Sequence, residues 1–209
     1  MFPVVLDLAR LPVILAGSGP QAARRLALLD EDRAAHVKVH SPTPSDRLVE
    51  AAGARLVRRW PTPAEVAQVP VLLISDGVES GVLRDLVAIA RAAGTLVNVE
   101  DQPDLSDFHS PASVRRGDLL GTVSTGGRSP GLAGRLGRFL GEIFGPEWQT
   151  KLEDLTALRT QWREAGADAP EVRAWTDAWV ERHGQLPDEA EAAAAALRHM
   201  ALPTRASAS

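Results

Sequence analysis

The chain has 209 residues, of which 44% are hydrophobic and 24% charged, with a formal net charge of −4 and no cysteine. The missing cysteines exclude disulfides, thiolate metal sites and cysteine nucleophiles, which suits a reducing cytoplasm. The acidic charge disfavours a general nucleic-acid binder, and no apolar run approaches the ~20 residues that span a bilayer. Because Asp7 and Arg10 interrupt the apolar start, we expect no signal peptide. We therefore expect a cytoplasmic protein with neither nucleic-acid nor membrane partners.

The first hundred residues alternate short apolar runs with helical patterns. Helices are expected over residues 21–29, from a cap at Ser45 to Ala52, and over residues 81–93. Strands are expected at residues 4–6, 12–16, 37–40, 54–58, 71–74 and 96–99. This alternation predicts an α/β fold, a parallel sheet with helices on both faces. Right-handed crossovers then place all carboxyl ends of the strands at one edge, where ligands bind.

A glycine-rich turn follows the first buried strand and has the form G-x-G-x-x-A. Gly17 allows the tight turn, Gly19 lets the backbone approach a pyrophosphate, and Ala22 lets helix and strand pack closely. The free N–H groups at the start of the following helix attract anions. A glycine-rich turn without a ligand is the alternative. We favour a dinucleotide site, formed by Gly17, Ser18, Gly19, Pro20, Gln21 and Ala22.

The ends of two other strands are expected to line the same cofactor. The strand at 37–40 lacks the usual acidic residue that binds the adenosine ribose, and Ser41 stands in its place. No arginine follows immediately to hold a 2′-phosphate, which favours NAD over NADP. Ser75 and Asp76 follow the strand at 71–74 and belong to the same edge.

Asp101 comes just after the buried strand at 96–99, on the predicted ligand edge. A carboxylate in this position can act as a general base. It can equally be a solvated aspartate that caps a turn, and position alone favours neither interpretation.

The next segment is polar and locally basic. A strand is expected at 119–124 after a turn at Gly117 and Asp118, and a helix capped by Ser129 is expected to end near Phe144. The five residues 124–128 precede this helix with two glycines between hydroxyl and arginine side chains, a pattern that favours an anion-binding nest over a plain loop. Five arginines within 24 residues suit a small polyanionic ligand: Arg115, Arg116, Arg128, Arg135 and Arg138.

Beyond Pro146 the pattern is helical throughout. Helices are expected at 147–165, 170–182 and 187–201, followed by a frayed tail of seven residues. Four tryptophans in this part are expected to pack in the core or at an interface rather than to stack on a ligand.

Three stretches of the chain, in the same order and spacing, resemble the precorrin-2 dehydrogenase family, which includes the N-terminal module of bacterial siroheme synthase. They are FPVVLDLARLPVILAGSG, NVEDQPDLSDF and FHSPASVRRGDLLGTVSTGGRSPGLAGRLGRFL. The resemblance covers residues 1–145 well and the helical tail loosely. It implies a Rossmann-like NAD-binding domain at 1–112, a central dimerisation region at 113–145, a C-terminal helical domain at 146–209, and a homodimer.

The resemblance also implies an activity, the NAD-dependent oxidation of the tetrapyrrole precorrin-2 to sirohydrochlorin in siroheme or cobalamin biosynthesis. It implies a dehydrogenase without the methyltransferase module of fused siroheme synthases. Asp101 is then the catalytic base. The substrate carboxylates are then met by residues His109, Ser124, Thr125, Gly126, Gly127 and Arg128.

Three alternatives remain in view. Some relatives also insert iron, and Asp101 could accept pyrrole protons with help from His109, but the five histidines show no metal-site spacing. A non-catalytic NAD-sensing module would explain the glycine turn and the helical tail, but not the sequence STGGRSP. A short-chain reductase is disfavoured because it normally needs a tyrosine, and the chain has none.

Overall fold

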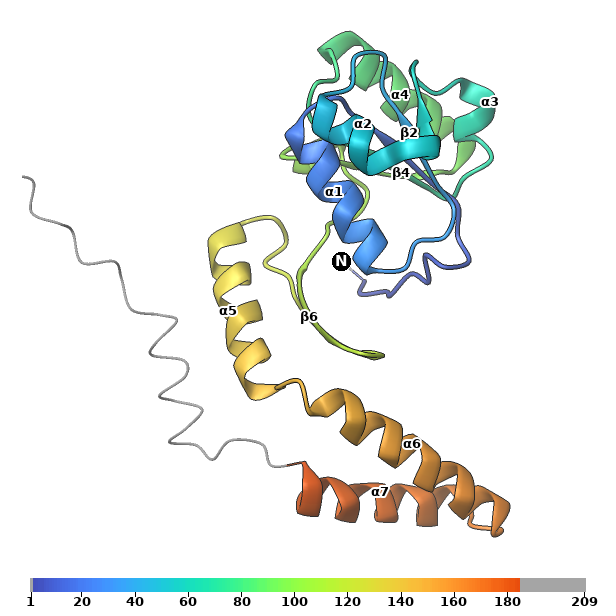
Figure 1. Ribbon diagram of the computed structural model, residues 1–209, viewed down its shortest axis with the longest axis vertical. Coiled ribbons are helices and arrows are strands. Elements are labelled where there is room, and N and C mark those ends of the chain that lie inside the picture. Colours follow the sequence, from blue (N-terminus) through green and yellow to red (C-terminus); the bar gives the residue numbers. More distant parts are fainter. Residues whose placement is uncertain (1, 185–209) are drawn as a thin grey trace, which may run out of the picture. The chain divides into compact units, whose positions relative to one another are not determined.

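The computed structural model describes residues 2–184 (Figure 1). The chain divides into two compact units, one ending at His109 and the other beginning at Ser110. The helix expected at 187–201 and the expected frayed tail lie outside the described residues. Within the described part, no helix is long and apolar enough to cross a membrane.

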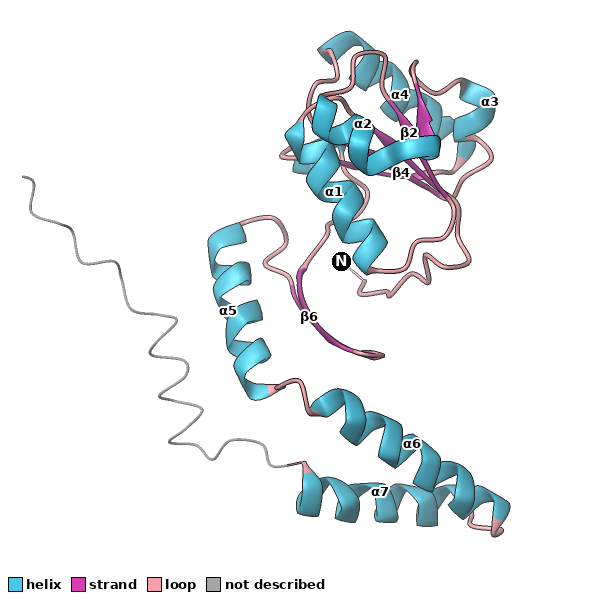
Figure 2. Ribbon diagram, viewed as in Figure 1, coloured by secondary structure: helices cyan, strands magenta, loops and turns pink. Residues whose placement is uncertain are grey.

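The first unit contains a five-stranded sheet in which every neighbouring pair is parallel (Figure 2). The strand order is β3-β2-β1-β4-β5, so the order reverses between β1 and β4. A reversal of this kind marks the place where open α/β sheets bind ligands. The strands are β1 (Val13–Ala16), β2 (Val37–His40), β3 (Leu56–Val57), β4 (Val71–Ile74) and β5 (Leu96–Val99).

Helices cover both faces of this sheet, which confirms the predicted fold class. Alternate strand residues point to opposite faces, so Leu15 packs with α1 and α2, and Ile14 with α3 and α4. In α1 the buried residues recur with helical spacing from Ala22 to Leu29. The helices are α1 (Pro20–Glu31), α2 (Asp46–Ala52), α3 (Pro63–Val66) and α4 (Ser80–Ala93), with short 3₁₀ turns η1 (Gly53–Arg55) and η2 (Pro103–Leu105).

Three details of this unit differ from the prediction. Residues 4–6 form no strand, because no neighbouring strand pairs with them, and Val5 is 77% exposed. The strand expected at 54–58 shrinks to β3, because η1 takes up the residues before it. Helix α3 was not expected, although Thr62 and Glu65 carry its signature, a capping box in which each side chain binds the other's backbone N–H.

The second unit begins with an antiparallel hairpin, β6 (Ala112–Arg116) and β7 (Leu119–Val123). The expected turn at Gly117 and Asp118 joins the strands, with Gly117 at φ +59°, whereas β6 was not expected. Helix α5 (Pro130–Ile143) packs on the hairpin, where Gly137 allows close approach: a Cβ there would lie 3.2 Å from that of Ala112.

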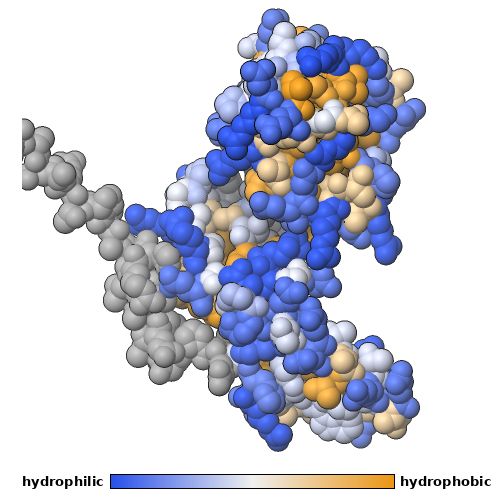
Figure 3. Space-filling view, viewed as in Figure 1, coloured by the Kyte–Doolittle hydropathy of each residue, from blue (hydrophilic) through white to orange (hydrophobic). Residues whose placement is uncertain are grey.

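Two further helices, α6 (Trp148–Glu164) and α7 (Ala169–His183), follow in the described part of the second unit. They pack against one another, and the rings of Trp162 and Trp175 meet edge to face with centroids 5.4 Å apart. Tryptophan thus contributes to packing here, as expected. On the visible face of the molecule, hydrophilic residues predominate, with small apolar patches between them (Figure 3).

Candidate active site

The turn between β1 and α1 is built for close packing. A Cβ on Gly17 would lie 2.9 Å from the Cβ of Ala22 and 3.1 Å from that of Ser75. Real Cβ atoms do not approach one another so closely, so this position requires glycine. Helix α1 then begins at Pro20, whose missing N–H costs nothing there.

The carboxylate of Asp76, just after β4, lies at the N-terminus of α1. Its oxygens accept hydrogen bonds from the backbone N–H of Ala22 at 3.0 Å and of Gln21 at 3.3 Å. A Cβ on Gly19 would lie 2.6 Å from Cγ of Asp76. The helix end therefore holds anionic oxygens, as its free N–H groups and dipole favour. The group that approaches Gly19 in this structure is a side chain of the protein itself.

The expected ribose contact, Ser41, is fully buried at the end of β2. Its hydroxyl shares a hydrogen bond of 2.7 Å with the hydroxyl of Ser18. Gly77 packs against Ser18 from the other side: a Cβ on Gly77 would lie 2.8 Å from the Cβ of Ser18. The turns after β1, β2 and β4 therefore form one tightly packed edge, which brings together the predicted cofactor residues of the first unit.

His40 occupies the last position of β2 and is also fully buried. Neither ring nitrogen has a hydrogen-bond partner within the described part of the chain. Burial lowers the pKa of His40, and the negative charge of Glu65 opposes that shift in part. The side chain is therefore held neutral in the folded protein at neutral pH.

The end of β5 places Glu100 and Asp101 at the same edge. Glu100 accepts a hydrogen bond from the hydroxyl of Ser75, and its backbone N–H donates to the carbonyl of Ile74 at 2.9 Å. Asp101 is exposed and has a left-handed backbone, with φ +57°. Strained backbone of this kind clusters at functional sites. It turns the chain at the point where the predicted base stands.

Two polar residues near this edge, the half-buried Arg25 and the buried Asn98, were missed in the sequence. Arg25 of α1 donates a hydrogen bond to the Oδ1 atom of Asn98 in β5, and Asn98 donates one of 2.7 Å to the carbonyl of Phe108. Asn98 is 6% exposed. The available signal was a single amide within the apolar run LVNV, because a buried polar side chain needs partners.

The predicted anion nest lies in the second unit, in the loop before α5. Gly126 and Gly127 both have positive φ, 63° and 77°. The hydroxyl of Thr125 accepts a hydrogen bond from the N–H of Ser129 at 3.1 Å, and the hydroxyl of Ser124 accepts one from the N–H of Gly126 at 3.2 Å. These hydroxyls thus stabilise the loop itself. The loop brings residues 124–128 together beside the N-terminus of α5.

The arginines of the basic stretch serve different purposes. Arg116 donates to the carbonyls of Phe144 at 2.7 Å and Gly141 at 3.0 Å, so it satisfies the C-terminus of α5. Arg128, by contrast, has an exposed side chain.

His109, expected near the substrate, is half-buried at the end of the first unit. Within residues 2–184, no cluster of histidine and acidic residues could hold a metal ion.

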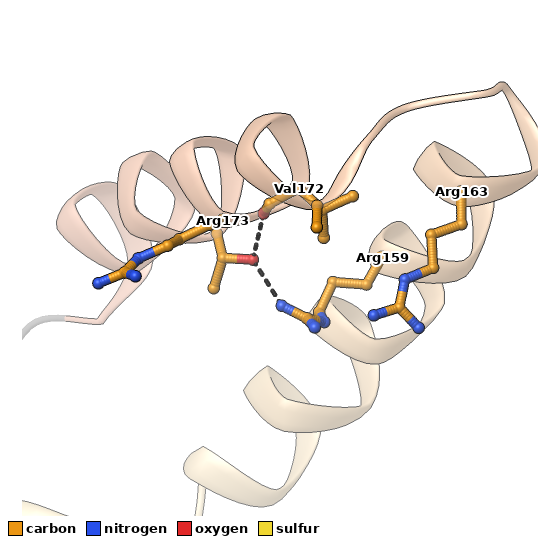
Figure 4. A pocket seen from close by; sticks show the side chains of 6 residues that line it. Arg159, Arg163, Val172 and Arg173 are labelled. Carbon is orange, nitrogen blue, oxygen red and sulfur yellow. Dashed lines mark hydrogen bonds between the residues drawn. The ribbon is translucent and has the colours of Figure 1, made fainter.

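A pocket of about 280 Å³ lies between α6 and α7 (Figure 4). Arg159 extends from α6 toward Thr176 and donates a hydrogen bond of 2.9 Å to its hydroxyl, which in turn donates to the carbonyl of Val172. None of the residues predicted for the site lines this pocket. Its lining residues are Arg159, Arg163, Ala169, Val172, Arg173 and Thr176.

Comparison with known proteins agrees with this picture. A family described as putative NAD(P)-binding matches residues 4–112, which is more than half of the chain. The chain therefore belongs to this NAD(P)-binding family. The geometry alone does not identify the ligand of the edge formed by the turns after β1, β2 and β4. The family match indicates that this ligand is NAD(P).

The similar curated proteins are siroheme synthases. That of Methylococcus capsulatus is 34% identical over 179 residues, which cover 85% of this chain and 37% of the relative. That of Methylobacillus flagellatus is 35% identical over 133 residues, which cover 63% of this chain and 28% of the relative. The chain thus spans about a third of the length of these relatives.

Among solved structures, one described as SirC, precorrin-2 dehydrogenase, superposes with a TM-score of 0.69. The match covers 95% of this chain and 98% of that one, at 19% identity. At this identity the likeness establishes a shared fold, which extends over both units of the chain.

Proposed function

We propose that this chain oxidises precorrin-2 to sirohydrochlorin with NAD, and that Asp101 is the catalytic base. The observation that carries the proposal is the position of Asp101. Its carboxylate follows β5 at the same sheet edge as the glycine turn of the NAD(P)-binding family. The similarity to siroheme synthases and to a structure described as a precorrin-2 dehydrogenase supports the choice of substrate.

The reaction removes two hydrogens from the macrocycle, one as a hydride and one as a proton. A bound dinucleotide supplies the hydride acceptor. The protein must hold the dinucleotide, orient the macrocycle and accept the proton. Asp101 suits the last task because its side chain is exposed, so that the carboxylate can reach a substrate and release the proton to water.

The residues present fit a dinucleotide. The N–H groups of Gln21 and Ala22 already hold two carboxylate oxygens, so a pyrophosphate would find suitable donors there once Asp76 moves aside. At the end of β2, residues 41–45 contain no basic side chain that would pair with a 2′-phosphate. This absence supports NAD rather than NADP.

The substrate carries eight carboxylates, and the loop at residues 124–128 is proposed to bind some of them. The exposed Arg128 offers a fork that matches a carboxylate, beside a loop in which Gly126 and Gly127 have positive φ. His109 is proposed to contribute as well. We further propose that residues 113–145 mediate a homodimer and that residues 146–209 form a separate helical domain.

The decisive experiment is anaerobic incubation of the purified protein with precorrin-2 and NAD, with NADH and the sirohydrochlorin spectrum followed together. Replacement Asp101→Ala should lower turnover by about 10² to 10⁴, the usual worth of a general base. The matched control is Asp104→Ala, which removes another exposed carboxylate from the same loop.

Two other outcomes would redirect the assignment. Turnover that persists in Asp101→Ala would remove this residue from the chemistry while leaving the dehydrogenase in place. Binding of NAD without turnover, with NAD or NADP, would favour a non-catalytic module that senses the dinucleotide.

A further inference from the structure

Arg25 connects helix α1 to the ends of two strands. Its side chain is half-buried, and its guanidinium donates to the carbonyl of Ile74 at 3.4 Å and to Oδ1 of Asn98. Burial lowers the pKa of Arg25, and the charge of Glu100 opposes this shift.

Asn98 links Arg25 to Phe108, in the segment that follows the Asp101 loop. It lies on the α1 face of β5, because its neighbours Val97 and Val99 pack on the opposite face. Its amide nitrogen donates to the carbonyl of Phe108, whose side chain packs against the core beneath α1 and α2. Arg25 thus fixes the amide orientation that holds Phe108.

The returning segment is also fixed along the free edge of β5. The Oγ atom of Ser106 accepts from the N–H of Val99 at 2.9 Å, and a carboxylate oxygen of Asp107 accepts from the N–H of Val97 at 3.0 Å. The N–H of Asp107 donates to the carbonyl of Val97 at 2.7 Å. The loop that carries Asp101 is therefore held at both of its ends.

Such restraint is needed because of the backbone at Asp101. The left-handed region is unfavourable for a residue with a side chain, although aspartate tolerates it better than most, so contacts that fix the neighbouring chain help to maintain it. The contacts from Arg25 through Asn98 to Phe108, with those of Ser106 and Asp107, supply that restraint.

We propose that Arg25 is a positioning residue, which acts through Asn98 to hold Asp101 where it can take a proton from the substrate. This proposal rests on the function proposed above. It assigns two tasks to helix α1. The backbone N–H groups at its N-terminus bind the dinucleotide, and the guanidinium of Arg25 helps to position Asp101.

The test compares Arg25→Ala with Arg25→Lys and with the control Arg24→Ala, which removes an exposed arginine from the same helix. In Arg25→Ala we expect kcat to fall by about tenfold to hundredfold, the effect of a small misplacement of a reacting group. The dissociation constant of NAD should change less than twofold. Lysine can restore one of the two hydrogen bonds, so Arg25→Lys should recover part of kcat.

A second readout does not depend on the substrate. Hydrogen exchange of the amides at residues 100–108 should be faster in Arg25→Ala than in Arg24→Ala. Unchanged exchange, or a kcat equal to that of Arg24→Ala at saturating substrate, would overturn the proposal. If the wild-type protein does not oxidise precorrin-2, the proposed function fails, and the exchange experiment still decides whether Arg25 holds the loop. Should Arg25→Ala not fold, Arg25→Lys and Asn98→Ala provide the same comparison.

Discussion

The carboxylate of Asp76 occupies the space that a side chain at Gly19 would need, with Cγ of Asp76 2.6 Å from the position of a Cβ. The two residues are far apart in sequence, and they meet because β1 and β4 are neighbours in the sheet. A side chain at position 19 would therefore have to displace the Asp76 carboxylate, even before any dinucleotide binds. Asp76 and a pyrophosphate would compete for the same two N–H groups.

Removing that competitor should tighten cofactor binding. In Asp76→Ala the dissociation constant of NAD should fall about fivefold, because a helix cap of about 1 kcal/mol no longer has to be displaced. Without cofactor, the free energy of unfolding should fall by a similar amount. Calorimetric titration and urea unfolding measure the two effects, with Asp76→Asn as the control that keeps an acceptor oxygen. Weaker binding in both variants would mean that Asp76 helps to hold the cofactor.

A methyl group at Gly19 should destabilise the protein through the same contact. We expect Gly19→Ala to lower the free energy of unfolding by about 1–3 kcal/mol, because the added Cβ overlaps the carboxylate. In an Asp76→Ala background the loss should be smaller, since the overlapping group is gone. Gly81→Ala is the control, because a Cβ there meets nothing within 4 Å. Equal losses in both backgrounds would contradict the assigned contact.

His40 should make stability depend on pH. Its pKa is lowered by burial, so the unfolded chain, with an ordinary value near 6.5, binds the proton more readily than the folded protein does. The free energy of unfolding should therefore be highest above about pH 6.5 and should decrease as the pH falls below it. Urea unfolding at several pH values tests this. The decrease should be smaller in His40→Leu and unchanged in His36→Leu, which alters an exposed histidine.

Replacing two arginines of the basic stretch should have different effects, one on the KM for the substrate and the other on the free energy of unfolding. Arg128→Ala should raise the KM for precorrin-2 about tenfold, the effect of one lost charge-assisted hydrogen bond of ~1.4 kcal/mol, with NAD binding unchanged. Arg116→Ala should instead lower stability by about 1–3 kcal/mol, because two carbonyls at the end of α5 lose their donor. Steady-state kinetics and urea unfolding distinguish the two effects. A KM unaffected by Arg128→Ala would place the substrate carboxylates elsewhere.

The sequence predicted the secondary structure correctly where a segment's own residues determine it. The strands β1 and β4 are uniform apolar runs, and the caps at Ser45 and Ser129 mark helix starts that the structure confirms. The hairpin strand β6 was missed because its sequence, ASVRR, offers only Val114 as a clear apolar residue. Its pairing with β7 comes from packing on α5, which no local pattern contains.

The site was predictable in its separate parts and not in its contacts. Gly17, Asp76 and Asp101 each stand at the end of a predicted strand, so their common edge followed from the topology. That Asp76 binds the start of α1, or that Arg25 reaches Asn98, depends on pairings across 54 and 73 residues of sequence. The sites named from the sequence for cofactor, base and substrate remain predictions that the variants above can test.

The way the sheet ends bears on how copies of the chain can meet. At one border β3 offers only two residues, and at the other the side chains of Ser106 and Asp107 already occupy the N–H groups of β5. A strand from another molecule would find no continuous ladder to extend at either border of this five-stranded sheet. Edge-to-edge pairing of this sheet with that of a second molecule is therefore disfavoured.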